Sequence, residues 1–467
     1  MGPRAPRLSR HYVLLAASSR LTPFQTHRPV PRATASDSAV TPVSGGRFAL
    51  LRRVRPFWWA VAVPALVAAS ALVSTSPIRD AATLAPVPEA TLRLPVGYIV
   101  LAPVSALLDT LTLLSLRQHV ALLVTLLVVF AGWWWWRGRV VAPTVLASRR
   151  WVRRASRVAL ALVGVVSVYT AALLMPRPMA ALEVAPDIVV IDFHAHTKYS
   201  HDGRWNWTPD DVRRWHRDAG YAVAYVTDHR TFEGARDAWA NNPRLAGEGV
   251  SLLPGIEVVW KGEHVNVLDA DRVYNGILTP TLRDIDPDAL RLASLIPGRE
   301  PVLIETLPGH LAGMVSASGP GTPGIRAVEL IDGSPKGLGQ TRRERARIVH
   351  VADSLHLALV SGSDSHGWGF AAQGWTLLVV PGWRAATPEQ LSTALSATLR
   401  TGGSKSTRVV ERRVADTDAA LALPFTVPLV LWEMLRTLSP DERVMWIVWT
   451  VLVAGLLALS RRRQAVG

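Results

Sequence analysis

The stretch Asp192-Phe-His194-Ala-His196-Thr-Lys-Tyr-Ser-His201-Asp202-Gly-Arg204 decides how this chain folds, and it follows an apolar run over 188–191. That run predicts a β-strand. Residues i and i+2 of a strand point to the same face, so His194 and His196 can hold one metal ion between their imidazoles. His201 and Asp202 follow closely and could serve a second ion. Because a single His-x-His pair is weak evidence, the interpretation depends on what recurs downstream.

The same pattern recurs along the chain that follows. Apolar, strand-like runs each carry a side chain of the metal-ligand type at or near one end. In order, these side chains are Asp228-His229, Glu257, His264, His310 and Asp364-Ser-His366. Several strand ends therefore share this chemistry. In a chain without cysteine, this favours a hard-to-borderline metal site of nitrogen and oxygen ligands. Any one of these residues alone is more often a solvated loop residue, and we interpret His216 and His356 as structural because neither ends an apolar run.

Helix signals separate several of these runs. Thr208-Pro209-Asp210-Asp211 starts one helix with a cap, a first-turn proline and first-turn acids, and Gly220 ends it. Residues 342–354 predict another helix. Strands that alternate with helices predict an α/β fold with a parallel sheet, open or closed into a barrel. Catalytic residues of such folds gather at the carboxyl ends of the strands.

The motifs, in this order, resemble those of the polymerase-and-histidinol-phosphatase (PHP) family. They read Asp-x-His-x-His-Thr-x-x-Ser, Thr-Asp-His, Gly-Ile-Glu, a later His, and Ser-Asp-Ser-His, and they cover 187–401. The resemblance implies a PHP-like distorted (β/α)7 barrel that hydrolyses phosphate esters with two or three divalent metal ions, which are zinc, manganese or iron.

The resemblance also implies a set of ligands. The expected first ion is held by His194, His196, Glu257 and Asp364. Glu257 would bridge to a second ion, which His264 and His310 also bind. A third ion would be held by His229, His366 and one of His201 and Asp202, and an extra residue in Ser200-His201-Asp202-Gly203 leaves open which of the two coordinates. Glu257, Asp364 and His366 are the residues expected to be catalytic.

Two close metal ions can clamp an anionic ester, lower the pKa of a bridging water and stabilise the attacking and leaving oxygens. Asp192 and Asp228 stand one or two residues from ligand histidines, so we expect them to orient the imidazoles. Lys198, Arg230 and Lys261 lie beside ligand motifs and are candidates to hold the phosphate, with a solvated surface cation as the alternative for each. The alternative functions are a metal-dependent hydrolase of another bond, such as an amide, and a non-enzymatic membrane sensor that retains a structural metal site.

The rest of the chain predicts a membrane protein. Hydrophobic residues make up 49%, the mean hydropathy is +0.20, and there are 18 tryptophans. Apolar runs near the ~20 residues needed to cross a bilayer cover 57–74, 96–116, 120–136 and 158–175, and shorter runs cover 421–432 and 444–460. The run 96–116 is the least regular because it contains Pro103 and Asp109, and 421–432 holds two prolines, which favours the membrane interface.

These observations predict four regions. They are a disordered basic N-terminal tail (1–46), a transmembrane region with three or four helices (47–176), the PHP-like domain (187–401), and a C-terminal membrane region with one or two helices (419–461). The PHP-like barrel is thus expected to be inserted between N-terminal and C-terminal transmembrane helices.

The net charge of +15 comes from arginines that flank the apolar runs. They are Arg47, Arg52, Arg53, Arg55, Arg149, Arg150, Arg153, Arg154, Arg157 and Arg461 to Arg463. This distribution indicates positive-inside topology and anionic lipid, rather than specific nucleic-acid binding. The expected partners are therefore a phosphorylated small molecule and the lipid bilayer, and the expected location is the cell (inner) membrane.

Two topologies satisfy most of this pattern. Four crossings before the PHP-like domain place that domain in the cytoplasm but leave the basic loop 137–157 outside. A re-entrant run 96–116 places the loop inside and the domain outside. Each topology leaves one segment in an unfavourable position. On the sequence alone, the topology with a cytoplasmic domain is preferred.

Overall fold

The computed structural model describes residues 57–140, 147–175, 177, 179–260, 263–268, 302–307, 325–369 and 371–466. All described residues belong to one compact unit, Phe57–Gly467. The predictions for the tail 1–46, for Lys261 and for His310 lie outside the described residues.

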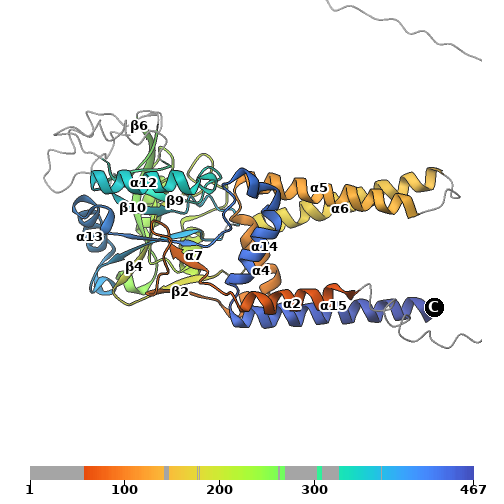
Figure 1. Ribbon diagram of the computed structural model, residues 1–467. Coiled ribbons are helices and arrows are strands. Elements are labelled where there is room, and N and C mark those ends of the chain that lie inside the picture. The colour runs from red at the N-terminus through yellow and green to blue at the C-terminus, as the bar shows by residue number, and fades with distance from the viewer. Residues whose placement is uncertain are drawn as a thin grey trace, which may run out of the picture. The chain divides into compact units, whose positions relative to one another are not determined.

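Ten strands of the described residues form one curled sheet of mixed direction, in the order β1-β12-β11-β4-β5-β6-β7-β8-β9-β10 (Figure 1). Their bounds are β1 Ile78–Asp80, β4 Ile188–Ala195, β5 Val223–Val226, β6 Ser251–Trp260, β7 Glu263–Leu268, β8 Val302–Glu305, β9 Ile325–Asp332, β10 Ala358–Gly362, β11 Gly374–Val379 and β12 Arg408–Arg412. A bridge between Ala195 and Ser365 joins the end of β4 to the chain after β10. Strands β4 to β10 therefore curl back toward their own beginning. A separate pair consists of β2 (Ala90–Arg93) and β3 (Ala181–Val184).

The expectation of a parallel sheet is correct for only part of it. β4, β5 and β6 run parallel, as do β8, β9 and β10. β7 is antiparallel to both β6 and β8, and β11 is antiparallel to β4 and β12. β7 differs because only residues 261–262 separate β6 from β7, and a parallel pair needs a crossover of a dozen residues or more.

Helices cover the sheet: α7 (Pro209–Ala219), α8 (Glu233–Ala240), α12 (Arg342–Leu355) and α13 (Pro388–Thr401). Short 3-10 turns are η2 (Ala246–Glu248), η3 (Gly337–Gly339), η4 (Trp383–Ala385), η5 (Gly403–Lys405) and η6 (Ala420–Phe425). The predicted start and end of α7 are confirmed. Thr208 and Asp211 form a reciprocal cap, and Gly220 adopts a left-handed φ of 88°. Leu391, Leu395 and Leu399 of α13 are fully buried against the sheet, each worth roughly 1.5–3 kcal/mol of apolar burial.

The remaining helices are apolar: α2 (Trp59–Ala71), α3 (Val96–Val100), α4 (Ala102–Thr112), α5 (Leu116–Val140), α6 (Ala147–Leu174), α14 (Thr426–Thr437) and α15 (Pro440–Val466). Four segments of the described chain are long and apolar enough to cross a membrane: Leu116–Trp136, Arg154–Leu174, Ala420–Thr437 and Pro440–Gln464. The run 96–116 is not one of them, because it breaks into α3 and α4 around a buried Asp109. Asp109 accepts hydrogen bonds from Tyr98, Arg177 and Arg412.

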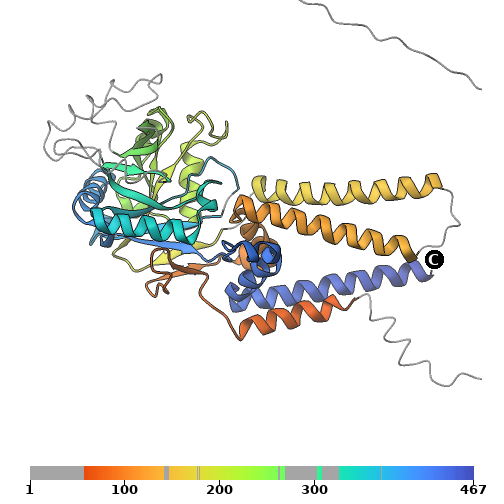
Figure 2. The same ribbon diagram turned by 45° about the horizontal axis from the view of Figure 1, so that its top comes forward.

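The apolar helices pair antiparallel. Arg461 at the end of α15 lies over the ring of Phe57, which precedes α2. At the other end of this pair, Thr75 donates to the carbonyl of Arg436 just before α15. α5 and α6 pair in the same way, as Figures 1 and 2 show. Nδ1 of His119, near the start of α5, lies 3.0 Å from the hydroxyl of Tyr169, near the end of α6.

The sheet extends beyond the predicted domain boundaries. β1 lies within the region predicted to be transmembrane, and β12 lies beyond residue 401, yet the two strands pair with Ile78 opposite Arg412. Nε of Arg79 lies 2.6 Å from Oε1 of Glu411, and both side chains are buried. Strands this short, with one of them between two apolar runs, leave no periodic pattern to detect.

Candidate metal centre

Four side chains from three strands of the sheet, or from the residues just after them, converge. His194 and His196 come from the end of β4, Glu257 from β6, and Asp364 from the turn after β10. Nε2 of His194 lies 3.0 Å from Nε2 of His196 and 3.0 Å from Oε2 of Glu257. Nε2 of His196 lies 3.2 Å from the same Glu257 oxygen and 3.1 Å from Oδ1 of Asp364. The structure thus brings together the first expected set of ligands.

These separations fit a single ion. Ligand atoms held about 2.1 Å from a tetrahedral ion lie about 3.4 Å from one another. Two imidazole nitrogens and two carboxylate oxygens also form the nitrogen and oxygen set that suits zinc, iron or manganese. His194, His196 and Glu257 are almost fully buried, so the cluster places donors of this kind where water has little access.

Two further groups share residues with the first. Glu257 accepts at 2.5 Å from Nδ1 of His264, and its other oxygen lies 3.4 Å from Nδ1 of His229. Oδ2 of Asp202 lies 3.3 Å from Nε2 of His229 and 3.2 Å from Nε2 of His366. Glu257 and His229 therefore stand between adjacent groups, as shared ligands of neighbouring ions would.

The structure distinguishes His201 from Asp202. The Asp202 carboxylate reaches two imidazoles of the cluster, whereas the side chain of His201 is 72% exposed and its Nδ1 lies 3.8 Å from Asp202. The ring of His201 lies 4.9 Å from that of His229, and its ligand atom lies within 4.8 Å of those of Asp202 and His229, so His201 is an exposed member of the outer group.

The backbone around Asp364 is strained toward the cluster. Asp364 has a φ of 46°, in the left-handed region that non-glycine residues rarely adopt. Its amide donates to the carbonyl of His194 at 2.9 Å, which fixes the turn after β10 against the end of β4. Such conformations cost on the order of 1–3 kcal/mol and cluster at functional sites.

The histidines and carboxylates of the cluster shift one another's pKa values. Burial alone would lower the pKa of His196, but hydrogen bonds to Asp364 and Glu257 raise it to about 10. Burial would also lower the pKa of His194, but the carboxylates of Glu329, Glu257 and Asp364 outweigh this effect. The pKa of His194 therefore lies well above its usual value. The histidines in turn hold the pKa of Glu257 well below its usual range despite burial. Protons on the imidazoles therefore balance the carboxylates where a cation would otherwise do so.

Asp192 and Asp228 lie beside the cluster but contact different groups from those expected. Asp192 accepts from the backbone amides of His194 and Ser363 and lies 2.7 Å from Nε2 of buried His216. Asp228 accepts from the amide and hydroxyl of Thr197. Both carboxylates thus hold the backbone that carries the ligands, because their short side chains meet amides before they reach the ligand rings. His216 is structural, as expected, and it anchors Asp192.

Sequence reasoning missed the acid that does meet a ligand imidazole. Oε1 of Glu329 on β9 lies 3.0 Å from Nδ1 of His194, and Oδ2 of Asp332 lies 3.8 Å away. Both acids are almost fully buried. The available signal was an acid inside the apolar strand 325–332 with a second acid at its end, the same pattern that marked the other strands.

The candidate phosphate-binding cations are placed unequally. Lys198 is exposed beside the cluster, with its ammonium 5.0 Å from the ring of Tyr199. Arg230 is half-buried, directly follows His229 and has a left-handed φ of 58°. Among the described residues, no salt bridge to an acid involves Lys198 or Arg230.

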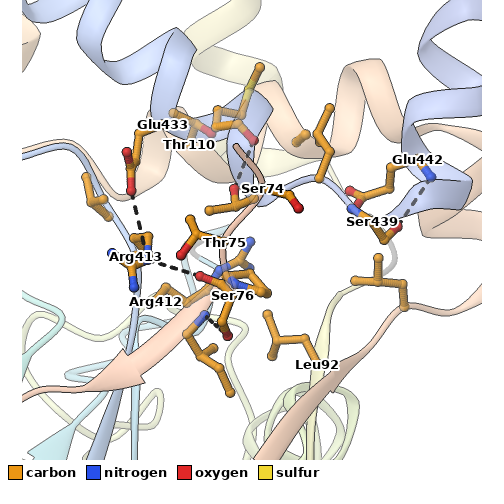
Figure 3. Close-up of a pocket in the computed structure, with 18 of the residues that line it drawn as sticks. Ser74, Thr75, Ser76, Leu92, Thr110, Arg412, Arg413, Glu433, Ser439 and Glu442 are labelled. Atoms are coloured by element: carbon orange, nitrogen blue, oxygen red, sulfur yellow. Dashed lines mark hydrogen bonds and ion pairs between the residues drawn. The ribbon is translucent and has the colours of Figure 1, made fainter. Parts of the chain in front are cut away.

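A separate cavity of about 390 Å³ lies where α3, α4, α14 and α15 meet the ends of β2 and β12 (Figure 3). Arg413 donates there to the Ser76 carbonyl and approaches Glu433 to 3.9 Å. None of the grouped metal ligands of the described chain lines this cavity. It belongs to the junction of the helices with the sheet rather than to the metal centre.

No protein-family model matches this chain, and no curated protein sequence matches it. Among solved structures, the chain is similar to PsfC from Pseudomonas syringae PB-5123, with 17% identity over 54% of this chain and 98% of that one and a TM-score of 0.33. It is similar to an amidohydrolase from Chromobacterium violaceum with bound sulfate and no metal (18% identity, 44% and 96% covered, TM-score 0.28). It is also similar to the lesion-specific endonuclease PfuEndoQ from Pyrococcus furiosus (14% identity, 46% and 57% covered, TM-score 0.34). At these values the likenesses carry no argument about function, which must be derived from the side chains.

Proposed function

We propose that this protein is a membrane-anchored, metal-dependent phosphoesterase of the PHP type. The observation that carries the proposal is the group of His194, His196, Glu257 and Asp364, in which Nε2 of each histidine lies 3.0–3.4 Å from the other three ligand atoms. Two or three divalent ions would supply a Lewis acid and an activated water at this position. Glu257 would be the shared ligand, because its two oxygens face different histidines.

The protein's own groups have distinct tasks in this proposal. Asp364 and His366 would complete the ligand sets from the strained turn after β10. Asp202, rather than His201, would join His229 and His366 at the outer ion. Lys198 and Arg230 would bind the phosphate oxygens, since neither forms a salt bridge with an acid of the described part of the chain. A charge-assisted contact of this kind is favoured over a neutral one.

Turnover by the purified full-length protein in detergent tests the proposal. With manganese or zinc added, we expect release of p-nitrophenol from mono- or bis-(p-nitrophenyl) phosphate, and no release from a p-nitroanilide amide. Glu257→Gln should abolish turnover while thermal unfolding stays cooperative, because a neutral amide is a poor bridge between cations. Equal rates in wild type and Glu257→Gln would sink the bridging role, and turnover of the anilide alone would favour an amide hydrolase.

The membrane anchor in this proposal consists of α2, α5, α6 and α15. α2 is short, but it runs beside α15. α14 does not cross in this arrangement, because its Glu433 approaches Arg413 after β12 and its Arg436 donates to the carbonyl of Val73 after α2. It therefore stays at the domain side of the bundle, and Figures 1 and 2 show it crosswise to α5 and α15.

In this proposal, the catalytic domain lies on one defined side of the membrane. The chain crosses three times before the domain and once after it, so the start of α2, the α5–α6 connection and the end of α15 share one side. The arginine groups 52–55, 149–157 and 461–463 all lie at or next to these points. Positive-inside topology then places them in the cytoplasm and the metal centre outside. This reverses the preference drawn from sequence alone, because the broken run 96–116 no longer counts as a crossing.

Cysteine labelling tests the orientation, since the natural chain has no cysteine. Exposed Lys405 lies in the catalytic domain and exposed Gln464 near the end of α15. A membrane-impermeant maleimide should label Lys405→Cys in intact spheroplasts and Gln464→Cys only after permeabilisation. The reverse result would place the metal centre in the cytoplasm. Recovery of the protein in an alkaline carbonate supernatant would exclude the membrane anchor itself.

A further inference from the structure

The metal centre is tied to the end of a membrane helix by a very short link. The amide of Gly369 donates at 2.7 Å to the carbonyl of Leu173 in the last turn of α6. Arg177 clamps the same point, because its guanidinium donates to the carbonyls of Gly369 and Ala172. His366 stands three residues before Gly369, and an extended chain covers at most about 3.6 Å per residue. The backbone of His366 therefore lies within about 11 Å of the residue fixed to α6.

The link is rigid rather than adjustable. Nε of Arg177 lies 3.1 Å from Oδ1 of Asp109, and both side chains are almost fully buried. Asp109 also holds Arg412, next to the sheet, at 3.1 Å. The amide of Ala371 donates to the hydroxyl of Thr112 on α4. Contacts to α4 and α6 thus fix the segment after His366 at the boundary of the apolar stretch Arg154–Leu174.

Two tryptophans are exposed at the rim of the metal centre, near the segment that is fixed to α6. The side chain of Trp205 is 83% exposed and that of Trp368 is 40% exposed. Arg204 connects them to the cluster. Its amide donates to the carbonyl of His366, and its guanidinium lies over the ring of Trp368. Exposed indole rings are costly in water and favourable at the membrane–water interface. If the rim lies at the boundary of the apolar stretch, both indole rings would lie among lipid headgroups.

We infer that the substrate is a phosphate ester in the headgroup of a membrane lipid, rather than a free phosphorylated metabolite. This inference rests on the proposed phosphoesterase function and specifies its substrate class. The ester phosphorus of a headgroup would lie at the depth of His366, with Lys198 and Arg230 available to bind its oxygens. In the reaction, the oxygen of water bonds to phosphorus and the bond from phosphorus to the ester oxygen breaks. A proton from that water passes to the leaving alcohol, and no oxidation state changes.

The test compares matched pairs of substrates with the full-length protein reconstituted in phosphatidylcholine vesicles with manganese. The monoester pair is phosphatidic acid in the vesicle and glycerol 3-phosphate in solution. The diester pair is phosphatidylglycerol and glycerophosphoglycerol. In at least one pair we expect kcat/KM to be higher for the lipid by about tenfold or more, equivalent to about 1.4 kcal/mol. Equal or faster turnover of the soluble member in every reacting pair would overturn the inference.

Tryptophan variants provide the second measurement. The double variant Trp205→Ala, Trp368→Ala should lower lipid turnover about tenfold and leave p-nitrophenyl phosphate turnover unchanged. Trp136→Ala, which removes an exposed tryptophan from α5 at the opposite end of the bundle, should change neither. Turnover of p-nitrophenyl phosphate without any lipid turnover would reject the lipid substrate and keep the phosphoesterase. Absence of both activities in the metal-loaded protein would reject the phosphoesterase, and the lipid substrate with it.

Discussion

Oε1 of Glu329 lies 3.0 Å from Nδ1 of His194, on the side of the imidazole opposite the nitrogen that faces His196 and Glu257. Metal-binding histidines usually donate their second ring nitrogen to a carboxylate, which fixes the tautomer and strengthens the ligand. Burial raises the pKa of Glu329 well above its usual value although His194 opposes this shift, so the pair shares a proton in the metal-free protein.

We therefore predict that Glu329→Gln weakens metal binding about 10- to 100-fold while the fold persists, since glutamine keeps the volume of the buried side chain. Isothermal titration calorimetry with zinc measures this loss of metal affinity. Glu183→Gln, at an exposed position, is the matched control and should bind as wild type does. Unchanged affinity in Glu329→Gln would mean that Glu329 does not orient His194.

The approach of Glu329 to His194 depends on a glycine. A Cβ at Gly362 would meet Oε1 of Glu329 and Cβ of His194 at 2.4 and 2.5 Å. Gly362→Ala should therefore push these side chains apart, lower the metal content and destabilise the fold by about 1–3 kcal/mol. Thermal unfolding and elemental analysis measure both effects. Gly339→Ala, where a Cβ would meet nothing within 4 Å, should be neutral, and an equally neutral Gly362→Ala would refute this account.

The raised pKa of His196 predicts that metal binding depends on pH. With a pKa of about 10 in the metal-free protein, His196 carries a proton at neutral pH, and a cation must displace it. The apparent affinity should rise roughly tenfold per pH unit for each displaced proton until the pH approaches that pKa. Calorimetry in buffers of different protonation enthalpy should detect at least one released proton per first ion. Binding without proton release would contradict the assigned charge state.

The same shift predicts how the metal-free protein responds to alkali. A raised pKa contributes stability that is complete below the unfolded value of about 6.5 and is lost as the pH rises toward about 10. After chelation, the melting temperature should thus fall between these pH values, and saturating zinc should flatten the profile. A melting temperature of the chelated protein that rises with pH would contradict this prediction.

Asp109 should be the most sensitive position of the junction. Its carboxylate faces Arg177 and Arg412, and all three side chains are mostly buried. Asp109→Asn leaves both cations without their acid, which typically costs about 3–5 kcal/mol. Thermal unfolding in detergent should show this loss. Asp218→Asn, at an exposed ion pair, should change stability little, and similar losses in both variants would argue against a special role for Asp109.

The sequence predicted the candidate ligands but not the geometry that brings them together. The strands that carry His194 and Glu257 or lead to Asp364 follow from local periodicity, which each strand carries in its own residues, although β6 continues past Glu257 to Trp260. The curl of the sheet and the reversed direction of β7 depend on tertiary pairing. Glu329 escaped notice because its partner, His194, is 135 residues away. The proposal of Asp202 over His201 rests on the positions of His229 and His366, which no spacing rule contains.

The pairing of β1 with β12 has a consequence for how the protein is made. Arg79 and Glu411, which face each other across this edge, are 332 residues apart in the chain. During synthesis, β1 leaves the ribosome early and stays unpaired until nearly all the remaining chain has emerged. A chain that stops before residue 408 leaves Arg79 without its acid and the β11 edge of the sheet open. Premature termination should therefore yield unfolded protein rather than a smaller working enzyme, so that only complete chains acquire the metal centre.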